Sequence, residues 1–430
     1  MPHRFPRRLH APALGLAALT GLALAAAPAC AQDAPAVPTV TTPAPAPPAP
    51  GAPPTPTTTT PTPSSPSAAA PPPKQTPVAP APNIAVTGEI DGYYQYQTSS
   101  PTQGQPLNGR IYAFRHNTPA LRLAWLDVYH TAPAAGGFGF KASLATGDAA
   151  DRDVPDAGSG VGESRFKNVA QAYGTYTTPG GFTVDFGKFL SPYGYDTTEA
   201  TLNYNYTLTL ATYLVPNYLA GARATYPIKS ANLAVSAFVV NSLEETPTAG
   251  VQDDNGRKDY ILRLNYTTPD GKFNYIPAYG VGSDKLSATG NEDITLFDNW
   301  LTYHVTKAVT LAGEYVYRKD KDKGGGYNLR GDGYGAYLRQ QLNPRNAYAL
   351  RVSRLTKHVD TFTTPITTTS FGANEVTATY EYKAADNFTT RIEYRHDNSN
   401  NPALFGFTKG NSPNPTSDQN AILVAGLFTF

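Results

Sequence analysis

The sequence has almost no sulfur and no long apolar segment beyond its leader. One cysteine, Cys30, and one methionine occur among 430 residues, which excludes a disulfide framework and a multi-cysteine metal site. No apolar run long enough for a spanning helix follows residue 30, and the mean hydropathy is −0.36. A bundle of membrane-spanning helices is therefore excluded. The net charge is only +1, so the chain lacks the basic surface of a nucleic-acid-binding protein.

Residue patterns that indicate catalysis or metal binding are also missing. The seven histidines are scattered, and no G-x-S-x-G elbow is present. Two acidic stretches, 148–156 and 320–324, lack the closing Glu of a twelve-residue calcium loop and fit solvated loops better. We predict no cofactor, no bound metal and no enzyme activity. An outer-membrane enzyme with a site at the extracellular rim stays as a minor alternative.

The N-terminal region predicts a secretory signal followed by a tether. Three arginines precede an apolar stretch at 14–27, and Ala29-Cys30-Ala31 offers a small-x-small cleavage site. We therefore assign 1–31 to a signal peptide, and consider lipidation of Cys30 the lesser alternative. Residues 33–82 contain 19 prolines and only two charged residues. Such a composition cannot bury a core, so 32–83 is predicted to be an extended, disordered periplasmic tether. It is either a passive spacer or a contact to the cell wall.

From residue 84 onward, short segments of alternating apolar and polar residues recur. In 388–395, Phe388, Thr390, Ile392 and Tyr394 alternate with polar or charged residues. A strand shows successive side chains to opposite faces, so this pattern suits one lipid-facing and one water-facing side. Sixteen strands are predicted, at 84–97, 120–131, 138–148, 168–177, 182–190, 218–228, 232–241, 258–267, 272–283, 294–304, 309–318, 330–341, 347–357, 372–383, 388–397 and 419–430.

The connections between these segments alternate in length. Short turns such as 178–181, 343–346 and 384–387 follow even-numbered strands, and longer polar loops follow odd-numbered ones. Short periplasmic turns and long external loops are typical of outer-membrane barrels. We therefore predict an all-β fold for 84–430: a transmembrane antiparallel β-barrel of about 16 strands, with 14 to 18 possible. Segments 232–241 and 294–304 are apolar on both faces, which indicates either a crowded lumen or misplaced boundaries.

A central block carries a family resemblance. Its elements are Phe186-Gly187-Lys188-Phe189, the turn Ser191-Pro192-Tyr193-Gly194, Glu199 and the stretch 216–221. These resemble the OmpL-like outer-membrane β-barrel porin family, over about 84–430 and most specifically within 168–241. The resemblance implies pore formation and does not define the solute.

The longest connection, 191–217, contains five tyrosines. Leaving these rings in water is unfavourable. One interpretation is a loop folded into the barrel as a constriction, as in the general porins that this plan resembles, with Asp196 and Glu199 at the narrowing. The other is an additional lipid-facing strand built on alternating leucines and tyrosines at 202–210. We favour the constriction.

Charged residues on the strands must face the lumen, because Arg or Lys on the lipid face costs about 2–4 kcal/mol at the bilayer midplane. Both signs occur in similar number, so strong charge selectivity is not predicted. The charges either line the pore or pair across strands and stiffen the wall. The candidate pore-lining or constriction residues are Glu89, Asp91, Asp185, Asp196, Glu199, Arg223, Arg263, Glu314, Arg318, Arg339, Arg351, Glu375, Glu381, Arg391, Glu393 and Arg395.

Together, these features predict a bacterial outer-membrane porin, exported through the periplasm, that passes small hydrophilic solutes by passive diffusion. Its predicted partners are outer-membrane lipid, the solutes and, through the tether, the cell wall; no nucleic-acid partner and no particular oligomeric state are predicted. The alternative from another class is a structural barrel, closed or nearly so, tethered to the periplasm.

Overall fold

The computed structural model describes residues 83–102, 107–153, 168–243, 255–285, 291–324, 326–361, 367–402, 404–409 and 412–430. All of them belong to one compact unit, Val78–Phe430. The predicted signal peptide and nearly all of the predicted tether lie outside the described residues.

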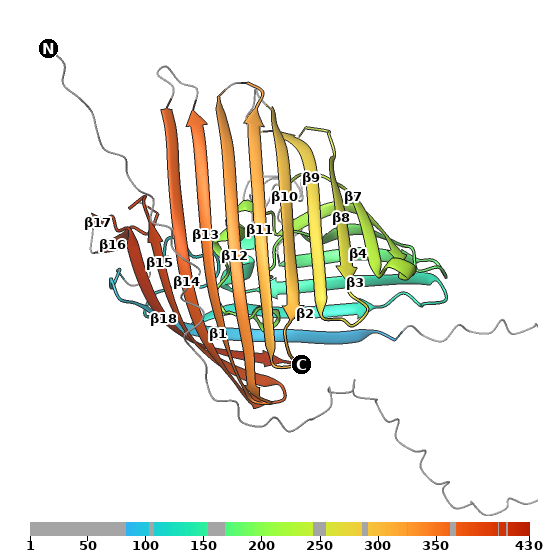
Figure 1. The fold of residues 1–430 in the computed structure, drawn as a ribbon, viewed down its shortest axis with the longest axis horizontal. Coiled ribbons are helices and arrows are strands. Elements are labelled where there is room, and N and C mark those ends of the chain that lie inside the picture. The colour runs from blue at the N-terminus through green and yellow to red at the C-terminus, as the bar shows by residue number, and fades with distance from the viewer. Residues whose placement is uncertain are drawn as a thin grey trace, which may run out of the picture. The chain divides into compact units, whose positions relative to one another are not determined.

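Sixteen antiparallel strands close into a barrel, in which each strand pairs with its neighbours along the chain and β1 pairs with β18 (Figure 1). The barrel strands are β1 (Ala85–Gln97), β2 (Ala120–His130), β3 (Gly137–Thr146), β4 (Val169–Thr177), β5 (Thr183–Leu190), β6 (Tyr218–Ile228), β7 (Leu233–Val240), β8 (Asp259–Thr267), β9 (Phe273–Lys285), β10 (Asn291–His304), β11 (Val309–Asp322), β12 (Tyr327–Asn343), β13 (Asn346–Thr361), β14 (Thr367–Ala385), β15 (Phe388–Ser399) and β18 (Asp418–Thr429).

The remaining elements lie in the connections. They are α1 (Asp148–Asp153), the 3₁₀ helices η3 (Ala200–Leu202), η4 (Leu210–Leu214) and η5 (Lys229–Ala231), and the small hairpin of β16 (Phe407–Lys409) and β17 (Ser412–Asn414). Among the described residues, no helix is long and apolar enough to cross a membrane.

The sixteen-strand prediction is confirmed, and each predicted segment corresponds to one barrel strand. The largest boundary differences fall on the long strands: β14 begins at Thr367, where the sequence predicted 372, and β13 ends at Thr361, where it predicted 357. Apart from Val359 and Phe371, these extensions carry polar residues, so they lack the apolar alternation that the prediction used. Strands β12–β14 are longer than β4–β8 (Figure 1).

Burial follows the predicted alternation. On β18, Ile422 and Val424 are exposed on the outer face, whereas Leu423 and Ala425 are buried on the inner face. On β15, Ile392 and Tyr394 are exposed, whereas Arg391 and Glu393 are buried inside. On these two strands the outer face is thus apolar and suits lipid, and the charges of β15 turn inward.

Candidate functional site

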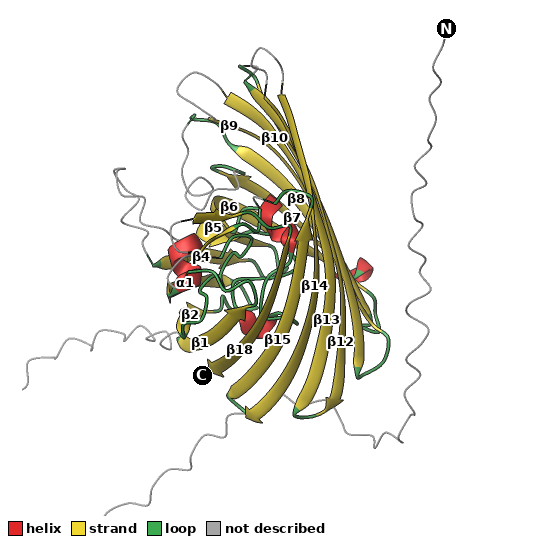
Figure 2. Ribbon diagram, turned by 90° about the vertical axis from the view of Figure 1, so that its left-hand side faces the viewer, coloured by secondary structure: helices red, strands yellow, loops and turns green. Residues whose placement is uncertain are grey.

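The connection between β5 and β6, residues 191–217, lies within the ring of strands, and we call it the inner loop. Its hydrogen bonds reach β1, β10, β11, β13 and β15, so it is held against several walls at once. Loops and short helices occupy the space between facing walls in Figure 2. No additional barrel strand forms between Leu190 and Tyr218, so the alternative interpretation of 202–210 as a lipid-facing strand is wrong. A physical reason is that the N–H groups of this segment find acceptors on the inner wall.

Carboxylates on the inner wall accept hydrogen bonds from the backbone of the inner loop. An irregular segment has few backbone partners of its own, and unsatisfied buried N–H groups are costly. A carboxylate is a strong acceptor for such groups. Four wall carboxylates serve in this way: Glu89 from Ala200 N (2.9 Å), Asp298 from Gly194 N (2.5 Å), Glu314 from Tyr195 N (2.7 Å) and Glu393 from Tyr206 N (2.6 Å).

Wall arginines complete this arrangement by donating to the carbonyl groups of the inner loop. The bonds run from Arg351 to Thr207 O (2.5 Å), from Arg391 to Ala200 O (2.7 Å) and from Arg395 to Leu208 O (2.6 Å). Arg351 also forms ion pairs with Asp196 of the loop and Glu375 of β14, each at 3.0 Å. All three of these side chains are 0 % exposed. Asp196 therefore lies in a buried ion pair and not at a water-filled surface.

The inner loop also has an apolar face, formed by Leu210, Ala211, Leu214 and Val215. It packs against apolar side chains that point inward from the wall: Phe238, Val240, Ile294, Leu296, Val316 and Leu355. This contact explains why segments 232–241 and 294–304 are apolar on both faces. The outer face of each segment meets lipid, and its inner face packs against the inner loop.

Two glycines of β12 allow the close approach of η4. A Cβ at Gly331 would lie 2.4 Å from Leu214 Cδ2, and a Cβ at Gly333 would lie 2.9 Å from the Cα of Ala211. Real Cβ atoms do not tolerate such distances. The glycines therefore let the loop pack directly on the wall of β12.

A second connection, between β1 and β2, folds over the end of the barrel that carries the long loops. Arg110 forms an ion pair with Asp397 of β15 at 2.7 Å, with exposures of 1 % and 0 %. Tyr112 Oη lies 3.2 Å from Thr198 Oγ1 of the inner loop. The sequence analysis missed this connection, because its ordinary polar composition gives no signal of folding inward.

Two further candidate residues, Arg318 and Asp91, are also buried in hydrogen-bonded ion pairs. Arg318 donates to Asp320 at 2.8 Å and to Leu243 O at 3.0 Å, and it is 1 % exposed. Asp91 accepts three hydrogen bonds from Arg122, of 2.6 to 3.0 Å, and one from Tyr206 Oη at 2.8 Å. Arg122 was missed because a bulge between Asp91 and Gly92 breaks the alternation that would have placed it. Its guanidinium turns inward and is fully buried.

A different group of charges lines the inner face beyond the inner loop, and we call it the open-wall group. It consists of Asp127 and Lys141, Asp185 and Arg223, and Arg263, on strands β2, β3, β5, β6 and β8. Lys141 pairs with Asp127 at 2.8 Å, and Arg223 pairs with Asp185 at 2.6 Å. The Nε atom of Arg263 has no hydrogen-bond partner within the described parts of the chain. These bases are partly exposed, unlike those beneath the loop.

On the opposite side, a cavity of about 180 Å³ lies between the inner loop and strands β12, β14, β15 and β18. Its polar lining includes Arg339, Glu381 and Arg391, with Thr201 and Tyr204 of the loop. Glu381 accepts from Arg339 Nη2 and from Arg391 Nη2, each at 2.7 Å. Two guanidinium groups thus share one carboxylate.

Glu199 is the acidic group of the inner loop that forms no ion pair in the described structure. Burial raises the pKa of its carboxyl to about 7, and the nearby negative charges of Glu89 and Asp127 add to this effect. Lys141 and Arg122 oppose the shift. Glu199 is therefore partly protonated near neutral pH.

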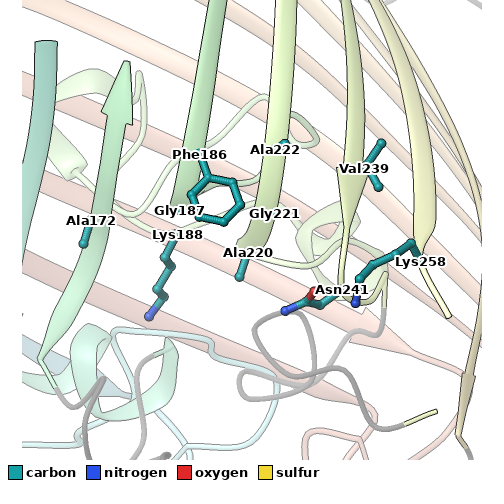
Figure 3. A pocket seen from close by; sticks show the side chains of 10 residues that line it. All are labelled: Ala172, Phe186, Gly187, Lys188, Ala220, Gly221, Ala222, Val239, Asn241 and Lys258. Atoms are coloured by element: carbon teal, nitrogen blue, oxygen red, sulfur yellow. The ribbon is translucent and has the colours of Figure 1, made fainter. Parts of the chain in front are cut away.

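A separate concavity of about 490 Å³ lies on the outer face of β4–β7 (Figure 3). It forms because Ala172, Ala220 and Ala222 carry only small side chains beside Phe186, which is 73 % exposed. Lys188, Asn241 and Lys258 lie towards one end of it. This groove faces the membrane side and is distinct from the lumen.

Metal-ligating side chains do not gather anywhere in the described portion of the molecule: no group of three or more His, Cys, Asp or Glu is placed to hold an ion. Of the two acidic stretches, Asp148 is engaged by Arg115 and Tyr93, and Asp156 lies outside the described residues.

Comparison with known proteins agrees with this geometry. A family model described as "Putative beta-barrel porin-2, OmpL-like" matches residues 83–430. The chain belongs to this family of outer-membrane β-barrel porins, so the resemblance seen in the sequence is confirmed. A comparison with curated protein sequences finds no match.

Solved structures with the same fold include several outer-membrane proteins. The outer membrane channel DcaP of Acinetobacter baumannii is 11 % identical with a TM-score of 0.55, and the match covers 81 % of this chain and 97 % of that one. An anion-selective porin from Comamonas acidovorans is 12 % identical with a TM-score of 0.53, covering 81 % and 99 %. OmpT of Vibrio cholerae, in its trimer form, is 13 % identical with a TM-score of 0.52, covering 81 % and 99 %. At these identities the likeness shows the fold, a porin-type barrel of the bacterial outer membrane.

Proposed function

We propose that this protein is a passive diffusion channel for small hydrophilic solutes and that the inner loop narrows its lumen. The observation that carries the proposal is the inner loop itself, bonded to five different strands of a closed barrel. A sixteen-stranded barrel is wide enough for an aqueous channel. A segment fixed across it reduces the open cross-section and so sets a size limit.

The test is single-channel conductance of the purified protein in planar lipid bilayers. The native protein should give discrete conductance steps. Deletion of 191–217 should raise the step size roughly twofold or more, because conductance grows with the open cross-section of a pore. Absence of steps from correctly folded barrels would refute the channel, and unchanged steps after deletion would refute the constriction.

A second variant guards against a deletion that fails to fold. Gly333→Leu adds a side chain whose Cβ would lie 2.9 Å from Ala211 Cα, so it should force η4 away from the wall and into the lumen. Conductance should therefore fall, opposite to the effect of the deletion. The matched control is Gly174→Leu, because a Cβ at Gly174 meets nothing within 4 Å. The control should conduct like the native protein.

A structural, non-conducting barrel is the second candidate function. Two buried ion pairs favour this alternative. Arg351–Asp196 holds the inner loop, and Arg110–Asp397 holds the connection between β1 and β2; all four side chains are at most 1 % exposed. Such a barrel would give no conductance steps in the native form and would gain them on deletion of 191–217. The same recordings thus distinguish the two functions.

A further inference from the structure

In three ion pairs of the lumen, Lys141–Asp127, Arg223–Asp185 and Arg339–Glu381, the basic member is the more exposed one. In the Arg391–Glu381 pair the order is reversed, because Arg391 is covered by the inner loop. Lys141 is 27 % exposed and its partner Asp127 is 10 % exposed. Arg223 is 27 % exposed and Asp185 is 7 % exposed. The carboxylates are covered further by neighbouring hydroxyls, since Asp127 accepts from Ser143 and Asp185 from Thr175, each at 2.5 Å.

The same asymmetry recurs on the opposite wall. Arg339 is 23 % exposed, whereas Glu381 is 15 % exposed and already accepts bonds from both Arg339 and Arg391. One carboxylate faces two guanidinium groups there, so the cavity beside them has an excess positive charge. The face of Arg339 lies over the ring of Tyr204, 5.7 Å from its centroid, which holds the guanidinium in place.

Arg263 adds a base with little neutralisation. It is half-buried, and its Nε has no hydrogen-bond partner among the described residues. Nearby, Arg223 carries a charge of the same sign and Asp298 one of the opposite sign. Asp298 is 1 % exposed and accepts from Gly194 N of the inner loop. The partly exposed base, Arg263, therefore faces the lumen, and the acid, Asp298, lies beneath the inner loop.

Equal numbers of acids and bases do not make such a lumen electrically neutral to a solute. A partly exposed base with a buried acid behind it forms a dipole with its positive end in the water. Low-dielectric walls concentrate such fields along a cleft and raise the local concentration of the opposite ion. Guanidinium groups also bind carboxylate and phosphate oxygens through paired N–H donors.

From this exposure pattern we infer that the lumen prefers small organic anions bearing a carboxylate or phosphate group over cations of similar size. This inference rests on the proposed channel function. The bases that carry the preference are Lys141, Arg223 and Arg263 of the open-wall group and Arg339 across the lumen. The inference goes beyond the sequence analysis, in which balanced charge predicted no strong selectivity.

The test is the reversal potential of the full-length protein in a planar bilayer separating two potassium chloride concentrations. Its sign should report anion permeation, with a permeability ratio of chloride to potassium of about two or more, since lumen potentials of about one kT or above suffice. Succinate, glycerol phosphate and neutral glycerol are then added separately. If only succinate reduces the chloride current, the lumen binds carboxylates. If only glycerol phosphate reduces it, the lumen binds phosphates. Either outcome supports the inference. Reduction by neither acid would overturn the binding of organic anions.

Variants locate the source of the preference. Arg263→Gln should lower the permeability ratio, and Arg263→Lys should keep it, because the lysine retains the charge. The matched control is Arg330→Gln on the outer face, where the arginine is 62 % exposed beside Asp332 at 15 %. The control should leave the ratio unchanged.

Two results would overturn the inference while leaving the channel intact. One is a conducting native protein with equal permeability to both ions, or with a preference for potassium. The other is an unchanged ratio in the double variant Arg223→Gln/Arg263→Gln, with migration of the folded barrel on gels confirming its structure. Absence of any conductance would instead refute the proposed function.

Discussion

Two sets of arginines occupy the inner face of this barrel and differ in what surrounds them. Arg351, Arg391 and Arg395 lie beneath the inner loop, are at most 3 % exposed and bond to loop carbonyl groups. Arg223 of the open-wall group is 27 % exposed and bonds only to the side chain of Asp185 within the described structure. Residue type and strand face are the same, but the role differs. A loop that covers an ion pair turns it into an anchor, and an uncovered pair remains a surface for solutes.

The largest expected effect distinguishes these sets by stability. Arg351→Met leaves Asp196 and Glu375 as buried carboxylates without their shared partner, which should destabilise the folded protein by about 3–5 kcal/mol. Arg223→Met affects a partly exposed pair, whose contribution is about 0–1 kcal/mol. Unfolding by urea in detergent micelles, followed by tryptophan fluorescence, measures both. Equal destabilisation by the two substitutions would contradict the division into anchors and solute surface.

For ion selectivity, the order of the two substitutions should be reversed, with the larger effect from Arg223→Met. Arg223→Met should alter the permeability ratio with little change in the unfolding curve, whereas Arg351→Met should increase current noise as the inner loop loosens. Arg351→Lys is the matched control for charge. It keeps one positive charge but loses the fork that contacts Asp196, Glu375 and Thr207 together, so partial destabilisation is expected.

The sequence alone was sufficient for the strands, because alternation is a local property of each segment. The sixteen strands and the family were both predicted correctly. The segments that are apolar on both faces, 232–241 and 294–304, also indicated where the inner loop packs. Their inward side chains Phe238, Val240, Ile294 and Leu296 contact it.

The partners of the inner charges could not be predicted in the same way. Arg351 and Asp196 are 155 positions apart, and Arg110 and Asp397 are 287 apart (397 less 110). Their pairing depends on the path of two irregular loops, which have no periodic pattern. Exposure is also set by that path, so no local pattern indicated that bases and acids of one lumen would be covered unequally.

A smaller effect, on pH dependence, follows from Glu199. Burial and the neighbouring Glu89 and Asp127 raise the pKa of this carboxyl to about 7, against the opposing Lys141 and Arg122. A carboxyl with a raised pKa is neutral below that value and gains its negative charge as the pH rises through it. The preference for anions should therefore be greatest near pH 5 and should weaken between pH 6 and 8.

Glu199→Gln removes this titration, so the permeability ratio of that variant should stay level across the same pH range. The measurement is the reversal potential at each pH, at constant salt. A native protein with no change between pH 6 and 8, or a Glu199→Gln variant that retains the native change, would show that Glu199 does not act on the permeating ions. Lys141→Met serves as the comparison, because it removes a positive charge that lowers the pKa of Glu199 and should therefore shift the transition to higher pH.

The smallest expected effect concerns the region outside the barrel. Residues 33–82 are rich in proline and nearly uncharged, and we propose that they form a spacer or a cell-wall contact. Deletion of 33–82 should leave conductance and the permeability ratio unchanged, because every contact described above lies between residues of the barrel unit. Sedimentation of the protein with purified cell-wall material distinguishes the two roles: loss on deletion supports a wall contact, and no change supports a spacer. A changed conductance would mean instead that the tether reaches the lumen, and the contrast between anchored and open walls would then be incomplete.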